Sequence, residues 1–415
     1  MKVTLFSNSD AIGGASKACY RLHHALLKDN IDSKLYVNNK ITDDKTVYGP
    51  DSLIEKLYIK SKPVLIKSLV KLNKTDNKII HSPSLINSGW PKKINKSDTE
   101  IANIHWVQKE MLSIKDISLI NKPLVWTLHD MWAFCGAEHV SYDLRWKEGY
   151  SKLNRSKYEK GFDLNRYVWE KKKKYWNSKI HLVVPSKWLF DCVKQSPLMN
   201  NWPLKIIPNS INTSIWKPIN KLYSRDLFDL PKDKPILLFG SFNANDQFHK
   251  GYDLLVDAIN KLGIDSNSFN LVIMGQEKPT NPIKFNFPTF YLGKLNDNQS
   301  LVALYSAVDL VLVPSRIESF SYIAAEAHSC GTPVVAFEIG GLKDIVIHKS
   351  TGYLAKAFDT KDFSIGIKWV LKKIEQDYHF GIDSRQKIIN LCDEKKIAKL
   401  YKTLYEEVIS ESKLR

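Results

Sequence analysis

Two glutamates eight residues apart could bind the hydroxyl groups of a ligand. Glu318 lies in a polar loop after a short apolar run, and Glu326 lies in an alanine-rich segment that predicts a helix. Free N–H groups and the positive dipole at a helix start attract anions, so Ser319, Phe320 and Ser321 could hold a diphosphate. A diphosphate site beside two carboxylates that accept hydrogen bonds from hydroxyls suits a nucleotide sugar.

These residues lie in a segment that predicts a strand, a loop, a helix and a second strand. Residues 309–314 and 334–337 are apolar, and Gly331-Thr332-Pro333 ends the helix between them. Such units build parallel sheets covered by helices, and ligands bind at the carboxyl ends of the strands. The 415-residue chain is too long for one ordinary core, and the alternation restarts at residues 235–240. The sequence therefore predicts an α/β protein with two separately wound sheets.

The spacing E-x-F-x-x-x-x-x-E from Glu318 to Glu326, followed by C-G-T-P-V-V, resembles the donor-binding motif of retaining glycosyltransferases of family 4. The resemblance implies the GT-B fold, with two Rossmann-like doubly wound parallel-sheet domains facing a central cleft. It implies domains at 1–213 and 214–390, with a C-terminal helix at 391–415 that crosses back to the first. In that family the first glutamate contacts the sugar and the second contacts the ribose. Ser321 departs from the pattern, since glycine is usual there; an isolated pair of glutamates would more often be solvated residues of a surface helix.

A second group of candidate residues follows a buried strand in the first half of the chain. His129 and Asp130 come directly after the apolar run P-L-V-W-T-L, at the strand end where such sheets place their chemistry. The segment T-L-H-D-M-W-x-F resembles family members that build bacterial surface polysaccharides. That likeness implies that His129 hydrogen-bonds the donor sugar, and that His105, Trp106, Asp130 and Trp132 lie on the acceptor side.

The family also carries cations that balance the donor diphosphate. Lys250 matches the expected lysine, whereas the usual arginine is missing and Ser241 or His249 stands in its place. The resemblance implies donor contacts from Ser241 and from two glycine loops, at Gly14 and Gly293. Gly14 on its own fits a purely structural turn equally well.

No metal and no cofactor are expected. The chain has no D-x-D segment, which metal-dependent nucleotide-sugar enzymes use to bridge a cation to the diphosphate. Its five cysteines are scattered and form no C-x-x-C pair, which fits thiols in a reducing cytoplasm. The resemblance implies that the acceptor hydroxyl attacks from the face of the leaving group, with retention of configuration.

The net charge of +17 calls for a negatively charged partner, whether nucleic acid, anionic lipid or a phosphorylated substrate. Residues 53–72 alternate lysines with apolar residues, which suits either a bilayer surface or two ordinary amphipathic helices separated at Pro63. Residues 139–179 interleave aromatics and lysines. That pattern suits single-stranded nucleic acid, a membrane interface, a lipid-diphosphate acceptor or plain solvated surface.

The function expected is a metal-independent retaining hexosyltransferase of bacterial cell-surface polysaccharide biosynthesis, such as lipopolysaccharide or capsule. Its partners would be a UDP- or GDP-sugar and a glycan or undecaprenyl-diphosphate-linked acceptor. The N-terminal run predicts a first strand rather than a signal peptide. We therefore expect a cytoplasmic protein, peripheral on the inner face of the membrane. The alternatives are a catalytically weak GT-B-shaped partner of another transferase and, on charge alone, a nucleic-acid-binding protein.

Overall fold

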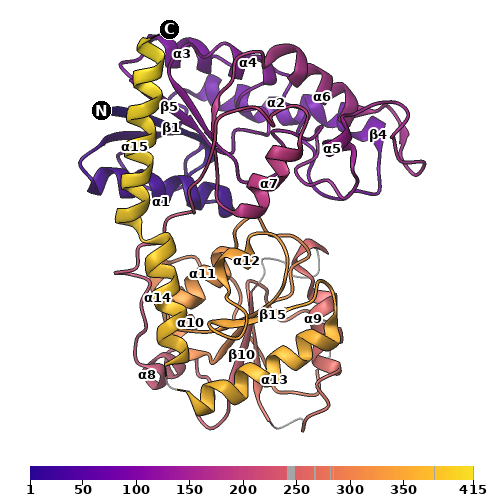
Figure 1. The fold of residues 1–415 in the computed structure, drawn as a ribbon, viewed down its shortest axis with the longest axis vertical. Coiled ribbons are helices and arrows are strands. Elements are labelled where there is room, and N and C mark those ends of the chain that lie inside the picture. Colours follow the sequence, from indigo (N-terminus) through magenta and orange to yellow (C-terminus); the bar gives the residue numbers. More distant parts are fainter. Residues whose placement is uncertain (241–247, 266–267, 281, 284, 378, 415) are drawn as a thin grey trace. The chain divides into compact units, whose positions relative to one another are not determined.

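The computed structural model describes residues 1–240, 248–265, 268–280, 282–283, 285–377 and 379–414. The chain divides into two units (Figure 1). Unit 1 comprises Met1–Ser210 and Glu394–Arg415, and unit 2 comprises Ile211–Asp393. The sequence placed the divisions after residues 213 and 390.

Unit 1 is built on a parallel sheet of seven strands among the described residues. In spatial order these are β3 (Val47–Tyr48), β2 (Asp32–Asn39), β1 (Lys2–Ser9), β5 (Ile101–Ile104), β6 (Leu124–Thr127), β8 (His181–Val184) and β9 (Leu204–Ile206). The chain starts in the middle of the sheet and pairs β1 with both β2 and β5. Such a reversal of strand order leaves a crevice outside the carboxyl ends of β1 and β5, where ligands bind.

Helices cover both faces of this sheet. The inner strands β5 and β6 are therefore buried on both sides, which is why their sequences are almost wholly apolar. One face packs against α1 (Gly14–Lys28) and α15 (Glu394–Lys413). The other packs against α3 (Trp90–Lys96), α4 (Ile114–Ser118), α6 (Leu164–Tyr175) and α7 (Lys187–Gln195). The last helix thus returns to unit 1, as the predicted fold requires.

Unit 2 repeats the plan with six parallel strands among the described residues. Their order is β12 (Thr289–Tyr291), β11 (Asn270–Met274), β10 (Ile236–Gly240), β13 (Leu310–Val313), β14 (Val334–Phe337) and β15 (Gly352–Ala355). One face packs against α9 (Tyr252–Asn260) and α13 (Thr360–Gln376). The other packs against α10 (Asn298–Ala307), α11 (Tyr322–Ser329), α12 (Leu342–Ile345) and α14 (Phe380–Cys392). The remaining elements are α8 (Lys221–Asp226) and the short 3-10 helix η2 (Phe248–Lys250).

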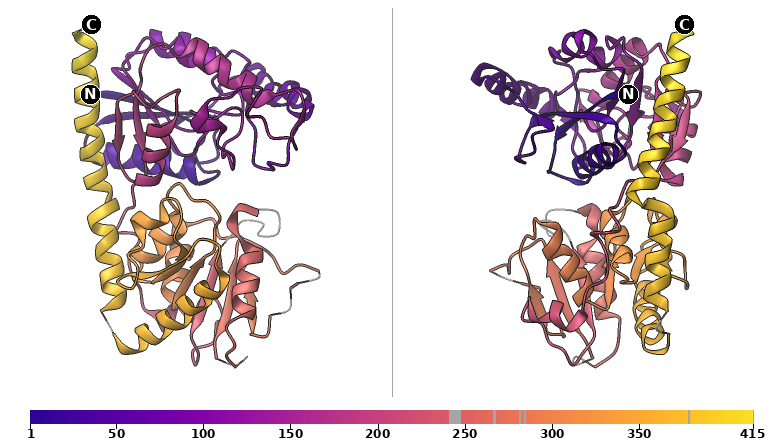
Figure 2. Two further views of the ribbon diagram at one scale, coloured as in Figure 1. Left: turned by 45° about the vertical axis from the view of Figure 1, so that its right-hand side comes forward. Right: turned by 90° about the vertical axis from the view of Figure 1, so that its left-hand side faces the viewer.

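Unit 1 also carries elements outside its two layers. Helix α2 (Leu53–Leu72) runs along the outside of the unit (Figure 2). It continues through Pro63 as one helix, so the prediction that proline divides this segment into two helices was wrong. A two-stranded antiparallel ribbon follows, of β4 (Asn73–Lys74) and β7 (Lys160–Gly161), with the short α5 (Arg145–Glu148) between them in sequence. Within the described ranges, no helix has the length and apolarity that crossing a bilayer demands.

Candidate active site

The two candidate catalytic residues of unit 2 are in direct contact. Glu318 lies in the loop after β13, and its Oε1 accepts hydrogen bonds from Lys250 Nζ at 2.6 Å and from Ser315 Oγ at 2.9 Å. Both members of the Lys250–Glu318 pair are mostly buried. The fold therefore joins two side chains 68 residues apart at the carboxyl edge of the sheet. An ion pair screened from water in this way holds both side chains in place more firmly than an exposed pair would.

A glycine explains how Lys250 reaches that position. Gly251 has a φ of +70°, and a Cβ built on it would overlap the carbonyl oxygen of Pro314. The backbone after β13 therefore passes directly against the start of α9, which only a residue without a side chain permits. The N–H of Arg316 also donates to the carbonyl of His249 at 2.8 Å. These contacts fix Lys250 against the loop that carries Glu318.

Two further glycines contact the loop that carries Glu318. Gly340 and Gly341 follow β14, and the N–H of Gly341 donates to the carbonyl of Glu318 at 2.8 Å. A Cβ on Gly340 would overlap the Glu318 carbonyl, and one on Gly341 would overlap that of Ser319. The backbone of residues 318–319 is thus held between two neighbouring strand ends.

Ser321, where the family pattern has glycine, adopts a backbone conformation that favours glycine. Its φ is +83° and its ψ is 91°, and its side chain makes no capping hydrogen bond to the helix. A non-glycine residue in such a region stores on the order of 1–3 kcal/mol of strain. The usual glycine therefore has a conformational reason at this position.

Glu326 lies one turn into α11 and is buried. Its Oε2 accepts a hydrogen bond from the hydroxyl of Tyr305, on the neighbouring helix α10, at 3.3 Å. The carboxylate is thus on the same helix as Ser321 but is already satisfied in part by a phenol. Phe320 is also buried and packs edge-on against Tyr322, with ring centroids 5.4 Å apart.

His249 and Arg316 lie near Lys250 and are the candidates for a second positive charge beside the diphosphate. His249 is held neutral because burial lowers its pKa, with Lys250 acting in the same direction and Glu318 only partly opposing them. Arg316, which the sequence reasoning missed, lies beside it but binds Asp253 through two hydrogen bonds of 2.7 and 2.5 Å. Its guanidinium also stacks on the Phe248 ring at 3.9 Å. Arg316 therefore secures η2 rather than offering a free charge, and Ser241 lies outside the described residues.

Gly293 lies beyond β12 with a φ of +60°. A Cβ there would overlap the carboxylate of Glu277, and the N–H of Gly275 donates to the Gly293 carbonyl at 2.6 Å. The glycine thus joins the ends of β11 and β12. Glu277 is a further carboxylate at this edge that no sequence motif indicated.

In unit 1, His129 pairs with His105 across the ends of β6 and β5. His105 Nδ1 and His129 Nε2 are 2.9 Å apart, and the rings are stacked with centroids at 5.2 Å. Burial lowers the pKa of His129 to about 4, which the charge of Asp130 only partly opposes. Burial also holds the pKa of His105 well below its usual value, with His129 acting in the same direction. Both imidazoles are therefore neutral at pH 7 and act as hydrogen-bonding groups.

Asp130 organises the loop that follows His129. Its carboxylate accepts hydrogen bonds from Trp106 Nε1 at 2.9 Å, His139 Nδ1 at 2.6 Å and the N–H of Trp132 at 3.0 Å. Burial by itself raises the pKa of Asp130, but His139 and these donors outweigh it and the net shift is downward. His139 also bonds Ser82 Oγ at 2.8 Å. His139, which no motif indicated, thus contributes most to lowering the pKa of Asp130, with the Trp132 and Trp106 donors adding to it.

Trp132 must be corrected from an acceptor contact to a core residue. Its side chain is completely buried, and its Nε1 donates to the carbonyl of Ser82 at 2.7 Å. The ammonium of Lys172 lies over its ring at 3.8 Å and donates to the carbonyls of Trp132, Cys135 and Gly136. Lys172 belongs to a lysine run that the sequence could place on a solvated face, yet it is fully buried.

The structure therefore forms two groups, one in each unit. Lys250, Glu318 and the backbone of 319–321 come together in unit 2, and His105, Trp106, His129 and Asp130 come together in unit 1. Gly14 begins α1, and a Cβ on it would meet nothing within 4 Å, so packing gives no reason for a glycine there. Its donor contact stays a prediction. Among the described residues, no group of His, Cys, Asp and Glu side chains is arranged to hold a metal ion.

Sequence comparisons match the second unit. Residues 225–387 match the family model described as glycosyl transferases group 1. A D-inositol 3-phosphate glycosyltransferase of Xylanimonas cellulosilytica is 34% identical over 145 residues, which are 32% of this chain and 33% of that protein. The chain thus spans about a third of the length of such curated relatives.

Structural comparisons match nearly the whole chain. Anabaena Alr3699/HepE, solved in complex with UDP and glucose, superposes with a TM-score of 0.62 at 15% identity, covering 97% of this chain and 99% of that one. WaaG, a glycosyltransferase involved in lipopolysaccharide biosynthesis, gives 0.60 at 13% identity, covering 96% and 98%. At these identities the likeness concerns the fold alone.

Proposed function

Because residues 225–387 are a glycosyl transferases group 1 domain and the chain has the predicted GT-B fold, we propose that this protein transfers a sugar from a nucleoside-diphosphate sugar to a hydroxyl acceptor. The observation that carries the proposal is the partly buried contact between Lys250 and Glu318 beside the start of α11. A cation, a helix start and a carboxylate in one place fit a diphosphate and the sugar attached to it.

The ion pair suggests how the donor is bound. The diphosphate competes with Glu318 for Lys250, since a phosphate oxygen can accept the same hydrogen bond from the ammonium. Glu318 Oε1, which keeps its hydrogen bond from Ser315 Oγ, can then accept another from a sugar hydroxyl. The family resemblance assigns Glu326 to the ribose. His129 of unit 1 is neutral, so it can act as a hydrogen-bonding group but not as a charged acid.

We propose a retaining, metal-independent reaction. The acceptor oxygen forms a bond to the anomeric carbon on the face from which the diphosphate departs, and the departing phosphate oxygen takes the acceptor proton. Lys250 and the first N–H groups of α11 stabilise the charge that develops on the diphosphate, which is worth several kcal/mol per well-placed donor. The absence of any D-x-D segment from the sequence supports this assignment of the role to a lysine.

The donor and acceptor follow from chemistry and from similar proteins. A UDP- or GDP-sugar is supported by the structure of Anabaena HepE with UDP and glucose. We propose a glycan or undecaprenyl-diphosphate-linked acceptor of cell-surface polysaccharide biosynthesis; WaaG, which has the same fold, is a glycosyltransferase involved in lipopolysaccharide biosynthesis. The net charge of +17 favours such phosphorylated partners, and we place the protein in the cytoplasm at the inner face of the membrane. We propose no nucleic-acid partner.

Turnover of nucleotide sugars tests the proposal. The purified chain is incubated with a panel of UDP- and GDP-sugars and short lipid-diphosphate glycans, and nucleoside-diphosphate release is measured. Glu318→Ala and Lys250→Ala should abolish release, whereas Lys373→Ala, which breaks a partly exposed ion pair to Asp377 at 2.8 Å in the same unit, should not. Equal turnover in all three variants would show that the site is misassigned. Chelators should leave the rate unchanged.

One observation favours a second candidate function, a GT-B-shaped binding partner with little catalysis. Neither neighbour of Lys250 supplies a second cation, because His249 is neutral and Arg316 is bound to Asp253. Calorimetric binding of UDP-sugars without nucleotide release, in the presence of acceptors that a related enzyme uses, would support this function.

A further inference from the structure

Helix α2 of unit 1 exposes more apolar surface than an ordinary surface helix does. Its one fully buried side chain is Lys62, while six large apolar side chains are between 57% and 81% exposed. These six are Leu53, Ile54, Leu57, Val64, Leu65 and Leu72. Soluble proteins rarely expose so many contiguous apolar side chains unless another surface covers them.

Polar contacts hold the helix in this orientation. Lys62 Nζ donates to the carbonyl of Glu110 at 3.2 Å, and Tyr58 donates its hydroxyl hydrogen to the carbonyl of Asn87 at 3.0 Å. Glu55 forms an ion pair with Lys93 at 2.7 Å. These polar contacts, together with Leu69 and Val70, which pack against the core, fix one side of α2 to unit 1. The six exposed apolar side chains are left on the surface.

The outward side carries two parallel rows. With about 3.6 residues per turn, Leu53, Leu57 and Val64 recur at steps of four and seven and lie along one line. Lysines at 56, 60, 67 and 71 recur at steps of four, seven and four and form a second line beside it; all four are exposed. A row of apolar side chains next to a row of lysines is the arrangement of a helix that lies in the surface of an anionic bilayer.

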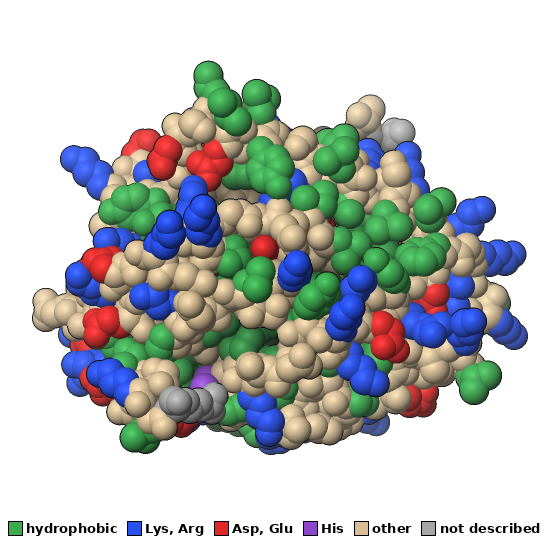
Figure 3. All heavy atoms as spheres, turned by 90° about the horizontal axis from the view of Figure 1, so that it is seen from above, with side chains coloured by type: hydrophobic (Ala, Val, Ile, Leu, Met, Phe, Trp, Pro, Cys, Tyr) green, Lys and Arg blue, Asp and Glu red, His purple; other side chains and the backbone are tan. Residues whose placement is uncertain are grey.

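The same surface continues beyond the end of α2. The N–H of Phe162 donates to the carbonyl of Leu72 at 3.0 Å, so the β4–β7 ribbon extends the helix. Phe162 and Tyr158 are exposed, and Lys157 lies over the Tyr158 ring at 5.1 Å. Exposed aromatic rings paired with lysines are typical of the boundary between lipid head groups and acyl chains. Seen from above, unit 1 presents hydrophobic side chains with lysine and arginine side chains beside them (Figure 3).

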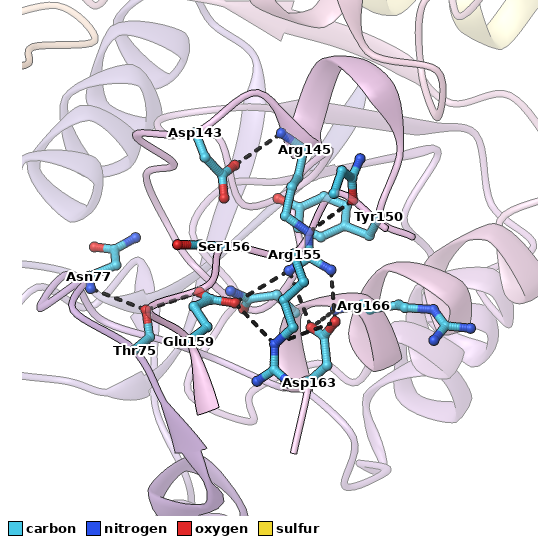
Figure 4. A network of polar contacts seen from close by, with 12 residues as sticks. Thr75, Asn77, Asp143, Arg145, Tyr150, Arg155, Ser156, Glu159, Asp163 and Arg166 are labelled. Carbon is cyan, nitrogen blue, oxygen red and sulfur yellow. Dashed lines mark hydrogen bonds and ion pairs between the residues drawn. The ribbon is translucent and has the colours of Figure 1, made fainter. Parts of the chain in front are cut away.

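A buried charge network holds this extension in place. Arg145 is buried and pairs with Asp163 at 2.8 Å and with Glu159 at 3.5 Å (Figure 4). Glu159 also accepts a hydrogen bond from Thr75, next to β4, at 3.0 Å. This network of Arg145, Glu159 and Asp163 therefore fixes the backbone that carries the exposed rings of Tyr158 and Phe162.

We propose that the outward side of α2, together with Tyr158 and Phe162, is a docking surface for an anionic phospholipid bilayer. This rests on the proposed function only for its purpose, which is to bring the enzyme to a lipid-linked acceptor. Charge complementarity selects the bilayer over a second copy, because self-association would bring two lysine rows together on chains of charge +17. The apolar row enters the lipid, and the lysines meet the head groups.

Vesicle co-sedimentation of the full chain tests the proposal. The wild type should bind vesicles of equal parts phosphatidylcholine and phosphatidylglycerol, and only weakly bind pure phosphatidylcholine. Replacing the lysines at 56, 60, 67 and 71 by alanine should weaken binding about fivefold per lysine. Leu57→Glu with Val64→Glu should abolish it. A control that replaces four exposed lysines of unit 2, at 343, 361, 368 and 372, removes the same charge and should bind within a few-fold of wild type.

Three outcomes would overturn the docking surface. These are undiminished binding by the α2 variants, equal loss in the unit 2 control, or a wild-type dimer in light scattering that Leu57→Glu dissociates. Because the changed side chains are exposed, thermal unfolding should be unaltered and will exclude misfolding. Nucleotide release with a soluble acceptor and no membrane should persist in the α2 variants. Its absence from the wild type as well would refute the proposed function and leave the docking result standing.

Discussion

Replacing Ser321 by glycine should stabilise unit 2. Ser321 has a φ of +83° and a ψ of 91° at the start of α11, and its side chain makes no capping hydrogen bond to the helix. Releasing a non-glycine residue from such a region recovers on the order of 1–3 kcal/mol. Glycine also makes the unfolded chain more flexible, which lowers the free energy of unfolding by about 0.5–1 kcal/mol. The net gain should be about 1 kcal/mol, which in a unit of this size corresponds to a rise in Tm of about 2–4 °C.

The measurement is thermal and urea unfolding of Ser321→Gly, with Ser319→Gly as the matched control. Ser319 lies two residues earlier in the same loop and has no positive φ. Glycine there should therefore only add flexibility to the unfolded chain and lower stability by about 0.5–1 kcal/mol. We therefore expect the two variants to change the free energy of unfolding in opposite directions. If Ser321→Gly were as destabilising as Ser319→Gly, the serine would not be strained and the account of why glycine is usual there would fail.

Three further predictions follow from other contacts. Gly251→Ala should reduce donor affinity at least tenfold in calorimetry, because its Cβ would overlap the Pro314 carbonyl and displace Lys250. The control Gly263→Ala also lies at positive φ but has open space around it, and it should leave donor affinity unchanged. Lys172→Met should destabilise unit 1 by about 3 kcal/mol in denaturant unfolding, since three buried carbonyls lose their donor, while the exposed neighbour Lys173→Met should change it by under about 0.5 kcal/mol. The pKa of His129 is about 4 in the folded protein and near 6.5 when unfolded, so the stability that it contributes is fully present above pH 6.5 and is lost as the pH falls toward 4. His129→Asn should remove about 3 kcal/mol of that dependence, and an equally steep decline in the variant would contradict the lowered pKa of this imidazole.

Much of the fold was available from the sequence because parallel strands buried on both faces have a recognisable composition. The runs that became β6, β13 and β14 are almost wholly apolar and are bounded by glycine, proline or polar residues. Only the structure shows why residues 251 and 340 are glycines, since a Cβ at either position would overlap a backbone carbonyl. The limits of the helices were harder to predict from the sequence, since Pro63 was expected to break α2 and did not.

Side-chain environments were predicted less well, because burial depends on contacts between segments far apart in the chain. Trp132 and Lys172 both follow patterns that suit a surface, yet they pack on one another in the core of unit 1. His139 and Arg316 carried no motif, and only the structure shows that they bind Asp130 and Asp253. No spacing along the chain distinguishes such residues from ordinary surface charges.

The sequence by itself determined that two parallel-sheet units are present and that Glu318 and Lys250 are the residues to examine, since strand composition and motif spacing are local properties. The tertiary structure decided that these two side chains bind each other, that His249 is neutral, and that α2 leaves six large apolar side chains exposed. The physical reason is that ion pairing, desolvation and exposure are set by neighbours in space. Those neighbours come from segments that the chain order does not bring together.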